Sequence, residues 1–306
     1  MPTLQQLRYI ALLDETLHFR RAAERAHVTQ PTLSAQLSAL EAKLDLTLVE
    51  RSRARVVMTP EGHEIAARAR RILREVDEIT GIAQRGRNPL GGTVRVGVVA
   101  SLGSYFLPLV IPDLHASHPE LRLYVREGAS GDLMSRLDEG TLDLLFVPLP
   151  ARSPELDCAR LFREPLLAVA ANDHPLAGLD AVPRARLRGE TILALEPGHK
   201  LHDQVRQICH DTGAEISLDY GATSLDTIRQ MVGMGLGLSL LPALYVRSEV
   251  QPNRVVTARP FTGPQPFRTV GMVWRKRAAR ATGHVALSRI LRDILRRTAP
   301  EVTVID

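Results

Sequence analysis

The stretch FRRAAERAHVTQPTLSAQLSALEAKLDLTLVERSRARVVMTPEG, residues 19–62, decides the architecture of the N-terminal part of the chain. Its apolar residues recur at the spacing of amphipathic helices on both sides of a short break. Thr29, or else Gln30, can stand just before the second helix, and Pro31 suits its first turn because the amide proton that proline lacks has no partner there. An arginine-rich, strand-like piece follows. This order predicts a winged helix-turn-helix domain over residues 1–58.

The second helix of this motif, expected over residues 31–44, carries short polar side chains at its N-terminal end. Such donors and acceptors suit base edges in the major groove of DNA. Flanking arginines can contact phosphates, which fixes the register and makes the affinity depend on salt. The alternative is a solvated polar face on an ordinary helical domain. The residues expected to contact double-stranded DNA are Arg20, Gln30, Pro31, Thr32, Ser34, Gln36, Arg51 and Arg53.

A long helix is expected after this domain, because Thr59 can cap it and Pro60 suits its first position. Apolar residues recur every seven positions along it, which suits packing against the same helix of a second copy. This stripe consists of Ile65, Ile72 and Ile79. The glycine- and proline-bearing stretch RGRNPLGG then ends the helix. The sequence therefore predicts a dimerising linker at residues 59–88.

Residues 89–306 alternate between β-rich stretches such as TVRVGVVA and stretches with helical periodicity such as SLDTIRQMVGMG. This alternation predicts an α/β fold with a largely parallel sheet and with ligand sites at the carboxyl ends of its strands. The predicted fold class of the whole chain is thus a multidomain α/β protein.

The composition favours a protein that is neither exported nor anchored in a membrane. The 306 residues include only two cysteines, Cys158 and Cys209, so a disulfide framework cannot stabilise a chain of this length. The first residues form an acid-containing amphipathic pattern rather than a signal peptide, and no apolar stretch reaches the roughly 18 residues of a spanning helix. A net charge of +5 allows a polyanionic partner. We expect a cytoplasmic protein without a cofactor.

Together these features resemble the LysR-type transcriptional regulators. The resemblance spans the whole chain and is most specific at residues 19–62 and in the stretch ATSLDTIRQMVGMGLGLSLLP. It implies a regulator, not an enzyme, that binds a promoter operator and holds a small-molecule effector between two Rossmann-like lobes, as in periplasmic binding proteins. The lobes are expected at residues 92–162 with 268–306 and at residues 163–267. The resemblance also implies a homodimer that assembles into a homotetramer, and contact with RNA polymerase if the regulator is an activator.

Within this family, the second half of the chain most resembles the peroxide-sensing OxyR branch, through GHKLHDQ and the cysteine at position 209. Where that branch has its peroxide-reacting cysteine, directly after a glycine and a histidine, this chain has Lys200. Cys209 keeps the position of the partner cysteine. The resemblance therefore implies a regulator that cannot form the peroxide-sensing disulfide. A redox role for Cys209 alone is the weaker alternative.

The stretch at residues 199–210 admits two further interpretations. Its metal-type donors are His199, His202, Cys209 and His210. Their spacing is only suggestive, because Cys209 and His210 diverge on a helix and no second pair completes a four-ligand set. Lys200 could act as a Schiff-base lysine if it were buried, but no nucleophile elbow or phosphate-binding loop accompanies it. We favour neither metal binding nor catalysis.

Hydroxyls and histidines at expected strand ends and helix starts form the candidate effector site. Free amides and hydroxyls at such positions suit anions, and a lysine adds positive charge. The alternative is plain helix capping, with Lys200 pointing to solvent or pairing with Glu196 or Asp203. A rival for the lobes as a whole is a solute-binding protein, against which the N-terminal domain argues. The candidate effector residues are Ser101, Ser130, His199, Lys200, His202, Thr223 and Ser224.

Overall fold

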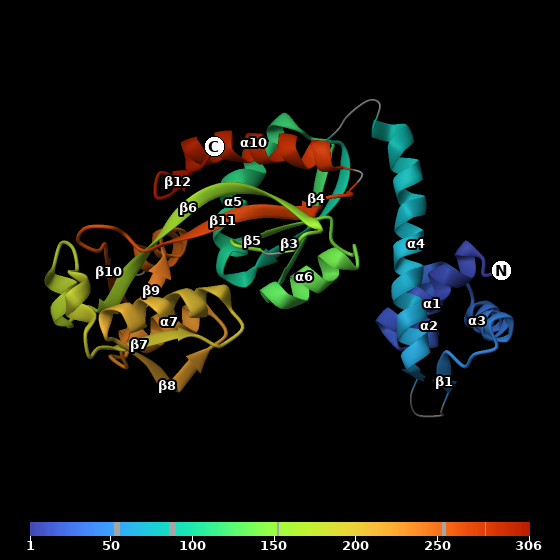
Figure 1. Cartoon of the computed structure of the whole chain (residues 1–306), viewed down its shortest axis with the longest axis horizontal. Coiled ribbons are helices and arrows are strands. Elements are labelled where there is room, and N and C mark those ends of the chain that lie inside the picture. The colour runs from blue at the N-terminus through green and yellow to red at the C-terminus, as the bar shows by residue number, and fades with distance from the viewer. Residues whose placement is uncertain (52–55, 86–89, 152, 253–254, 279) are drawn as a thin grey trace. The chain divides into compact units, whose positions relative to one another are not determined.

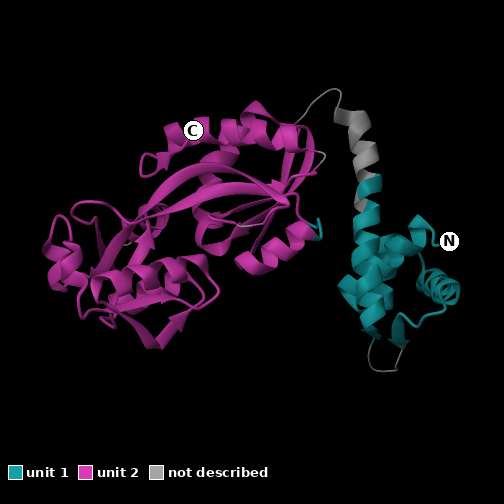
Figure 2. Ribbon diagram, viewed as in Figure 1, with its two compact units in different colours: residues 1–88, 139–141 teal, residues 89–138, 142–306 magenta. Residues whose placement is uncertain are grey.

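The computed structural model describes residues 1–51, 56–85, 90–151, 153–252, 255–278 and 280–306. The chain divides into two compact units, Met1–Asn88 with Glu139–Thr141 and Pro89–Asp138 with Leu142–Asp306 (Figure 2). No helix in the described ranges is long and apolar enough to cross a membrane. The first unit carries the predicted DNA-binding motif, and the second carries the alternating α/β part.

The first unit consists of helices and a small two-stranded wing (Figure 1). Its elements are α1 (Leu4–Thr16), α2 (Phe19–Ala26), α3 (Gln30–Leu44), β1 (Val49–Arg51), β2 (Val56–Met58) and α4 (Pro60–Arg85). The Thr29 hydroxyl caps α3 by accepting a hydrogen bond from the amide of Thr32 at 3.4 Å. At the start of α4, the Thr59 hydroxyl accepts one from the amide of Gly62 at 3.0 Å. Both predicted helix starts are confirmed, because these hydroxyls satisfy amides that a helix leaves unpaired.

The core of the first unit fixes the orientation of α3. Leu33, Leu37 and Leu40 are completely buried and pack with apolar residues of α1 and α2. Burial of each such side chain stabilises the unit by about 1.5–3 kcal/mol. Their spacing turns the opposite face of α3 outward. The wing is tied to the same helix, because the carboxylate of Glu41 accepts a hydrogen bond from the amide of Leu48 at 2.9 Å.

The second unit is an α/β structure with two lobes, each built around its own apolar core (Figure 1). Lobe I contains β3 (Gly92–Val99), α5 (Ala100–Ser117), β4 (Leu121–Gly128), α6 (Ser130–Asp138), β5 (Leu144–Pro148), the first half of β6 (Leu156–Ala171), β11 (Phe267–Arg275), α10 (Ala281–Thr298) and β12 (Thr303–Val304). Lobe II contains the rest of β6, η1 (Pro175–Gly178), η2 (Arg184–Leu187), β7 (Thr191–Leu195), α7 (Lys200–Thr212), β8 (Glu215–Ala222), α8 (Leu225–Gly233), β9 (Leu238–Pro242), α9 (Ala243–Tyr245), η3 (Val246–Val250) and β10 (Val256–Arg259).

One sheet runs through both lobes in the strand order β4-β3-β5-β11-β6-β9-β7-β8, with β10 and β12 also paired to β6. Within each lobe the strands that precede helices are parallel, as expected: β3 pairs with β4 and β5, and β7 pairs with β8 and β9. The prediction of a largely parallel sheet is wrong for β6 and β11, which pair antiparallel with each other and with their neighbours. The reason is that these two strands carry the chain from one lobe to the other and back.

Candidate DNA-binding surface and candidate effector site

Helix α3 presents a polar face at its N-terminal end. The exposed residues of this face include Gln30, Pro31, Thr32, Ala35 and Ser38. Ser34 and Gln36 are half-buried, and the side-chain carbonyl of Gln36 accepts a hydrogen bond from Gln6 of α1 at 3.2 Å. Ala35 was not among the predicted residues, because a criterion based on polar groups overlooks a methyl group, although a methyl group suits contact with thymine.

The flanking arginines are only partly described. Arg20 is exposed on α2 and pairs with Glu24 one turn further on, at 3.0 Å. An exposed pair of this kind contributes about 0–1 kcal/mol, so Arg20 can exchange its partner for a phosphate at little cost. Arg51 ends β1, but its side chain and the whole of Arg53 lie outside the described residues.

Helix α4 uses part of its apolar stripe within the first unit. Ile65 packs against the unit's own core, where the neighbouring Ala69 is fully buried. Ile72 is 45% exposed, and the side chain of Ile79 lies outside the described residues. Of the two stripe residues whose side chains are described, Ile72 is therefore the one open to a second copy.

The candidate effector residues lie at the carboxyl ends of parallel strands in both lobes. Those that follow β3 and β4 of lobe I are Ser101 and Ser130, and those that follow β7 and β8 of lobe II are His199, Lys200, His202, Thr223 and Ser224. Strand β9 is parallel to β7, so its carboxyl end, which leads into Leu244, lies on the same edge of lobe II.

A buried ion pair of Arg268 on β11 and Glu164 on β6 joins these two edges; we call this crossing the hinge. Both side chains are fully buried, and Nε lies 2.7 Å from Oε2. The guanidinium also donates to the hydroxyl (2.9 Å) and the carbonyl (2.8 Å) of Ser101, at the start of α5. The second oxygen of Glu164 accepts a hydrogen bond from the amide of Leu244 in α9 at 2.9 Å. The carboxyl edges of the two lobes therefore meet at the hinge.

A second contact between the lobes is aromatic. The ring of Tyr105 on α5 meets the ring of Tyr245 edge-on, with 5.1 Å between centroids. The Tyr245 hydroxyl donates to Asp226 at 2.9 Å and accepts from Nε of Arg229 at 3.1 Å. Burial raises the pKa of both tyrosines well above the ordinary value, so their hydroxyls stay protonated as donors.

Three of the candidate effector residues are held by the fold itself. Ser101 is only 8% exposed, and its hydroxyl is occupied by the hinge arginine. Nδ1 of His202 donates to the carbonyl of Leu195 at 2.6 Å. The Ser224 hydroxyl accepts from the amide of Thr227 at 3.2 Å, so the capping alternative holds for this residue.

The other four candidates, Ser130, His199, Lys200 and Thr223, make no side-chain hydrogen bond or ion pair in the described part of the chain. His199 stands before the first turn of α7 but does not cap it with its side chain. Lys200 is exposed at the first residue of that helix, and Asp203 pairs instead with Arg206 at 3.6 Å. The start of α7 thus combines unpaired amides with a free cation.

The two cysteines are unpaired and differ in environment. Cys158 is exposed on β6, whereas Cys209 is buried in the core of lobe II. Burial raises the pKa of the Cys209 thiol to about 11. Among the described residues, no group of three or more histidine, cysteine or acidic side chains is arranged to hold a metal ion.

A winged helix-turn-helix joined to a two-lobed α/β domain is the architecture of a DNA-binding transcriptional regulator with an effector-binding domain. Comparison with known families agrees with this class. Residues 4–63 match the bacterial regulatory helix-turn-helix protein of the lysR family, and residues 87–296 match the LysR substrate binding domain. The chain therefore belongs to the LysR family.

Its relatives include peroxide-responsive regulators. The DNA-binding transcriptional dual regulator OxyR of Escherichia coli K12 is 40% identical over 272 residues, 89% of each chain. A probable hydrogen peroxide-inducible genes activator of Streptomyces viridosporus is 38% identical over 297 residues, 96% of this chain and 95% of that one. A cysteine-substituted full-length OxyR from Pseudomonas aeruginosa superimposes with a TM-score of 0.78 at 36% identity, covering 97% of this chain and 95% of that one.

Proposed function

We propose that a small anion, bound at the hinge-facing edges of the two lobes, controls the operator affinity of this regulator. The observation that carries this proposal is Lys200. Its ammonium group is exposed at the first residue of α7, beside helix amides that no side chain caps. A cation and unpaired amides at a helix N-terminus favour a negatively charged ligand.

Further donors at the carboxyl ends of the parallel strands support an oxygen-rich anion. His199 directly precedes Lys200, while Ser130 at the start of α6 and Thr223 before α8 follow the parallel strands of the two lobes. None of these side chains has a partner in the described part of the chain. Carboxylates and inorganic oxyanions consist of acceptors only, so they match donors of this kind.

A thiol switch lacks support in this chain. Lys200 occupies the position where the resembled peroxide-sensing branch has its reacting cysteine, and a lysine cannot form a disulfide. Burial raises the pKa of the remaining Cys209 thiol to about 11, so very little reactive thiolate exists at neutral pH. We infer that the chain shares the architecture of the peroxide-responsive relatives without their thiol chemistry.

The DNA-binding form that we propose is a homodimer through α4, assembled further into a homotetramer on a promoter operator. The exposed Ile72 supports dimerisation through α4. It lies further along this helix than Ile65, which packs against the core of the first unit. Such a regulator would act in the cytoplasm, and it would contact RNA polymerase when it activates. The residues proposed to read or hold DNA are Arg20, Gln30, Pro31, Thr32, Ser34, Gln36, Arg51 and Arg53.

Calorimetry on the full-length protein tests the anion site. Citrate, malate, phosphate and sulfate are titrated at constant ionic strength into the wild type, into Lys200→Ala and into Arg206→Ala, which removes an exposed cation from the same helix. Loss of a charge-assisted hydrogen bond, about 1.5–3 kcal/mol, predicts an affinity weaker by roughly 10- to 150-fold for Lys200→Ala only.

A peroxide titration, read as operator affinity, accompanies the calorimetry. The proposal predicts no response to peroxide in the wild type and none in Cys209→Ser. Binding of every anion with equal affinity to the wild type and to Lys200→Ala contradicts the anion site. A peroxide response that disappears in Cys209→Ser contradicts the absence of thiol sensing.

A further inference from the structure

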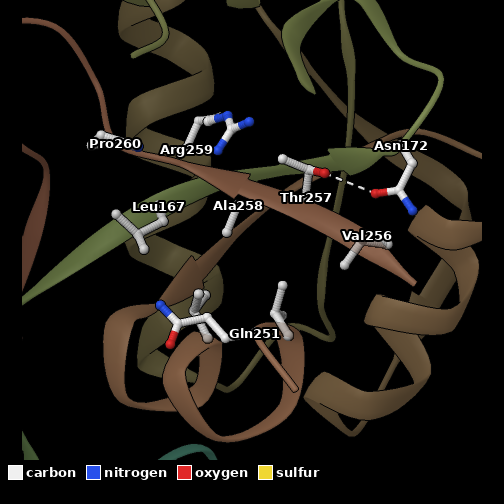
Figure 3. Close-up of a pocket in the computed structure, with 10 residues that line it drawn as sticks. Leu167, Asn172, Gln251, Val256, Thr257, Ala258, Arg259 and Pro260 are labelled. Carbon is white, nitrogen blue, oxygen red and sulfur yellow. Dashed lines mark hydrogen bonds between the residues drawn. The ribbon is translucent and has the colours of Figure 1, made fainter. Parts of the chain in front are cut away.

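Lobe II contains a pocket that none of the candidate effector residues lines. It lies between β10 and the turn η3 and has a volume of about 680 Å³ (Figure 3). Pockets that bind small molecules usually measure about 300–1,000 Å³. The pocket is therefore large enough for a ligand with one ring or a branched chain.

The walls of this pocket are mostly aliphatic. Strand β10 alternates, so that Val256 and Ala258 point toward η3, while Thr257 and Arg259 lie on the other side of the strand (Figure 3). The aliphatic lining consists of Leu167, Val246, Val250, Val256 and Ala258. Val246, Val250 and Val256 are almost completely buried, whereas Leu167 and Ala258 are half-buried and more accessible.

The polar groups of the pocket include one charged side chain, Arg259, which lies on the side of β10 away from η3. Nε and Nη2 of Arg259 both donate to the carbonyl of Ala177, at 3.1 and 2.9 Å, and Figure 3 shows its guanidinium directed away from η3. The hydroxyl of Thr257 donates to Asn172 at 2.8 Å. Gln251 is exposed at the rim, and its side-chain amide has no hydrogen bond among the described residues. This amide can offer one donor and one acceptor to a ligand. No charged side chain among the described lining residues faces the η3 side, so a charged ligand there would lose its hydration without an ionic partner.

The wall formed by η3 has an unusual backbone. The amide of Gln251 donates to the carbonyl of Val246 at 3.0 Å, which is the spacing of a π-helical turn. Such turns are rare and are frequently found at functional sites. The turn directly follows α9, whose Leu244 amide binds Glu164 of the hinge and whose Tyr245 ring meets Tyr105 of lobe I. A ligand that presses on η3 therefore acts on the segment that holds the two lobes together.

We propose that this pocket is a second ligand site, which binds a neutral molecule with an apolar body and one carboxamide-like group. We also propose that a ligand bound there alters the contacts of the hinge. The aliphatic walls take the apolar body, and Gln251 pairs with the carboxamide. The site is independent of Lys200, so its failure and the failure of the anion site are distinguishable.

Benzamide is a suitable probe, because it joins a ring to a neutral carboxamide, and benzoate is its charged counterpart of nearly equal size. Saturation-transfer NMR on the full-length protein measures binding to the wild type, Ala258→Phe, Gln251→Ala and Lys200→Ala. Ala258→Phe fills the pocket, and Ala185→Phe places the same side chain at an exposed position of η2 as a control. A ligand of this size is expected to bind with a Kd on the order of 1 mM.

We expect benzamide to bind the wild type, Ala185→Phe and Lys200→Ala equally, to bind Gln251→Ala about tenfold more weakly, and not to bind Ala258→Phe. Benzoate should bind this pocket at least tenfold more weakly than benzamide. Equal binding of benzamide to the wild type, Gln251→Ala and Ala258→Phe, or no binding to the wild type at 10 mM, overturns the site. A change in operator affinity on addition of benzamide, absent in Ala258→Phe, supports the coupling to the hinge, and binding without such a change overturns it.

Discussion

The hinge and the start of α7 each contain a cationic side chain, but one is buried with partners and the other is exposed without them in the described part of the chain. Arg268 is completely buried and meets one carboxylate and two oxygens of Ser101. Lys200 is exposed and meets no carboxylate in the described part of the chain. A charge in the interior needs partners to offset its lost hydration, whereas a charge at the surface needs none. The contrast separates a cation that maintains the lobes from one that is available to a ligand.

The largest expected effect comes from breaking the hinge pair. Arg268→Ala leaves Glu164 buried without its counter-charge, which typically costs about 3–5 kcal/mol. We expect the free energy of unfolding of the second unit to fall by that amount. The single tryptophan of the chain, Trp274, is buried in lobe I and reports this unfolding by fluorescence in a urea titration.

A matched control is available beside the hinge on the same strand. Arg163 is exposed, adjoins Glu164 on β6, and lies over the ring of Phe267 at 5.0 Å. A cation–π contact at an exposed site contributes about 0.5–1 kcal/mol, so Arg163→Ala should cost no more than that. Equal losses in Arg163→Ala and Arg268→Ala would show that burial does not distinguish the two arginines.

A second test uses a buried group that has no acidic partner among the residues that the structure describes. His284 on α10 is 3% exposed and lies against Trp274, with 5.7 Å between ring centroids. Burial, together with Arg280 and Arg275, lowers the pKa of His284 to about 4. Arg268 is buried as a cation beside the carboxylate of Glu164, whereas His284 is buried without a charge at neutral pH.

This pKa predicts loss of stability in acid. The unfolded chain binds the proton near pH 6.5 and the folded chain only near pH 4, so the contribution is fully present above pH 6.5 and is lost as the pH falls between these values. The loss approaches about 3 kcal/mol at the lower end. Urea titrations between pH 7 and 4 should show a smaller decline for His284→Leu than for the wild type. The exposed His210→Gln variant should follow the wild type, and an unchanged slope in His284→Leu would contradict the assignment.

The first unit could be predicted from local sequence, and the hinge could not. Leu33, Leu37 and Leu40 recur at helical spacing, and Thr29 stands two residues before Pro31. Short-range patterns therefore contain both the burial of α3 and its start. Glu164 and Arg268 are 104 positions apart, and each is a single charged residue in a strand. Only the register of β6 against β11 brings them opposite each other.

The candidate effector residues could be predicted from the sequence only in part. Sequence patterns placed them at strand ends and helix starts, because alternating strands and helices define those positions. They did not reveal that Ser101 binds Arg268 or that Ser224 caps α8, because a hydroxyl that caps and a hydroxyl that faces a ligand look identical in a sequence. The antiparallel course of β6 and β11 was missed for a similar reason, since strand direction depends on distant connections.

A smaller effect, on specificity and not on stability, is expected at α3. Gln30 is exposed at its first residue, so Gln30→Ala should leave the free energy of unfolding unchanged within about 0.5 kcal/mol. It should reduce discrimination at one base pair by about 1–3 kcal/mol, whereas Arg20→Ala should weaken binding to all duplexes alike. Fluorescence anisotropy with duplexes selected by the wild type, and with single-base variants of them, measures this. If Gln30→Ala weakens binding to all duplexes equally, Gln30 does not recognise a base.

The smallest expected change in stability is at Lys200, and it completes the contrast with the hinge. Because this ammonium has no partner in the described part of the chain, Lys200→Ala should change the free energy of unfolding by less than about 0.5 kcal/mol in the absence of anions. A bound anion stabilises the folded state by an amount that grows with its concentration relative to Kd. Citrate, compared with sodium chloride at equal ionic strength, should therefore raise the urea midpoint of the wild type and of Arg206→Ala, but not that of Lys200→Ala. A loss of more than 1 kcal/mol without any anion would instead make Lys200 a structural cation like Arg268.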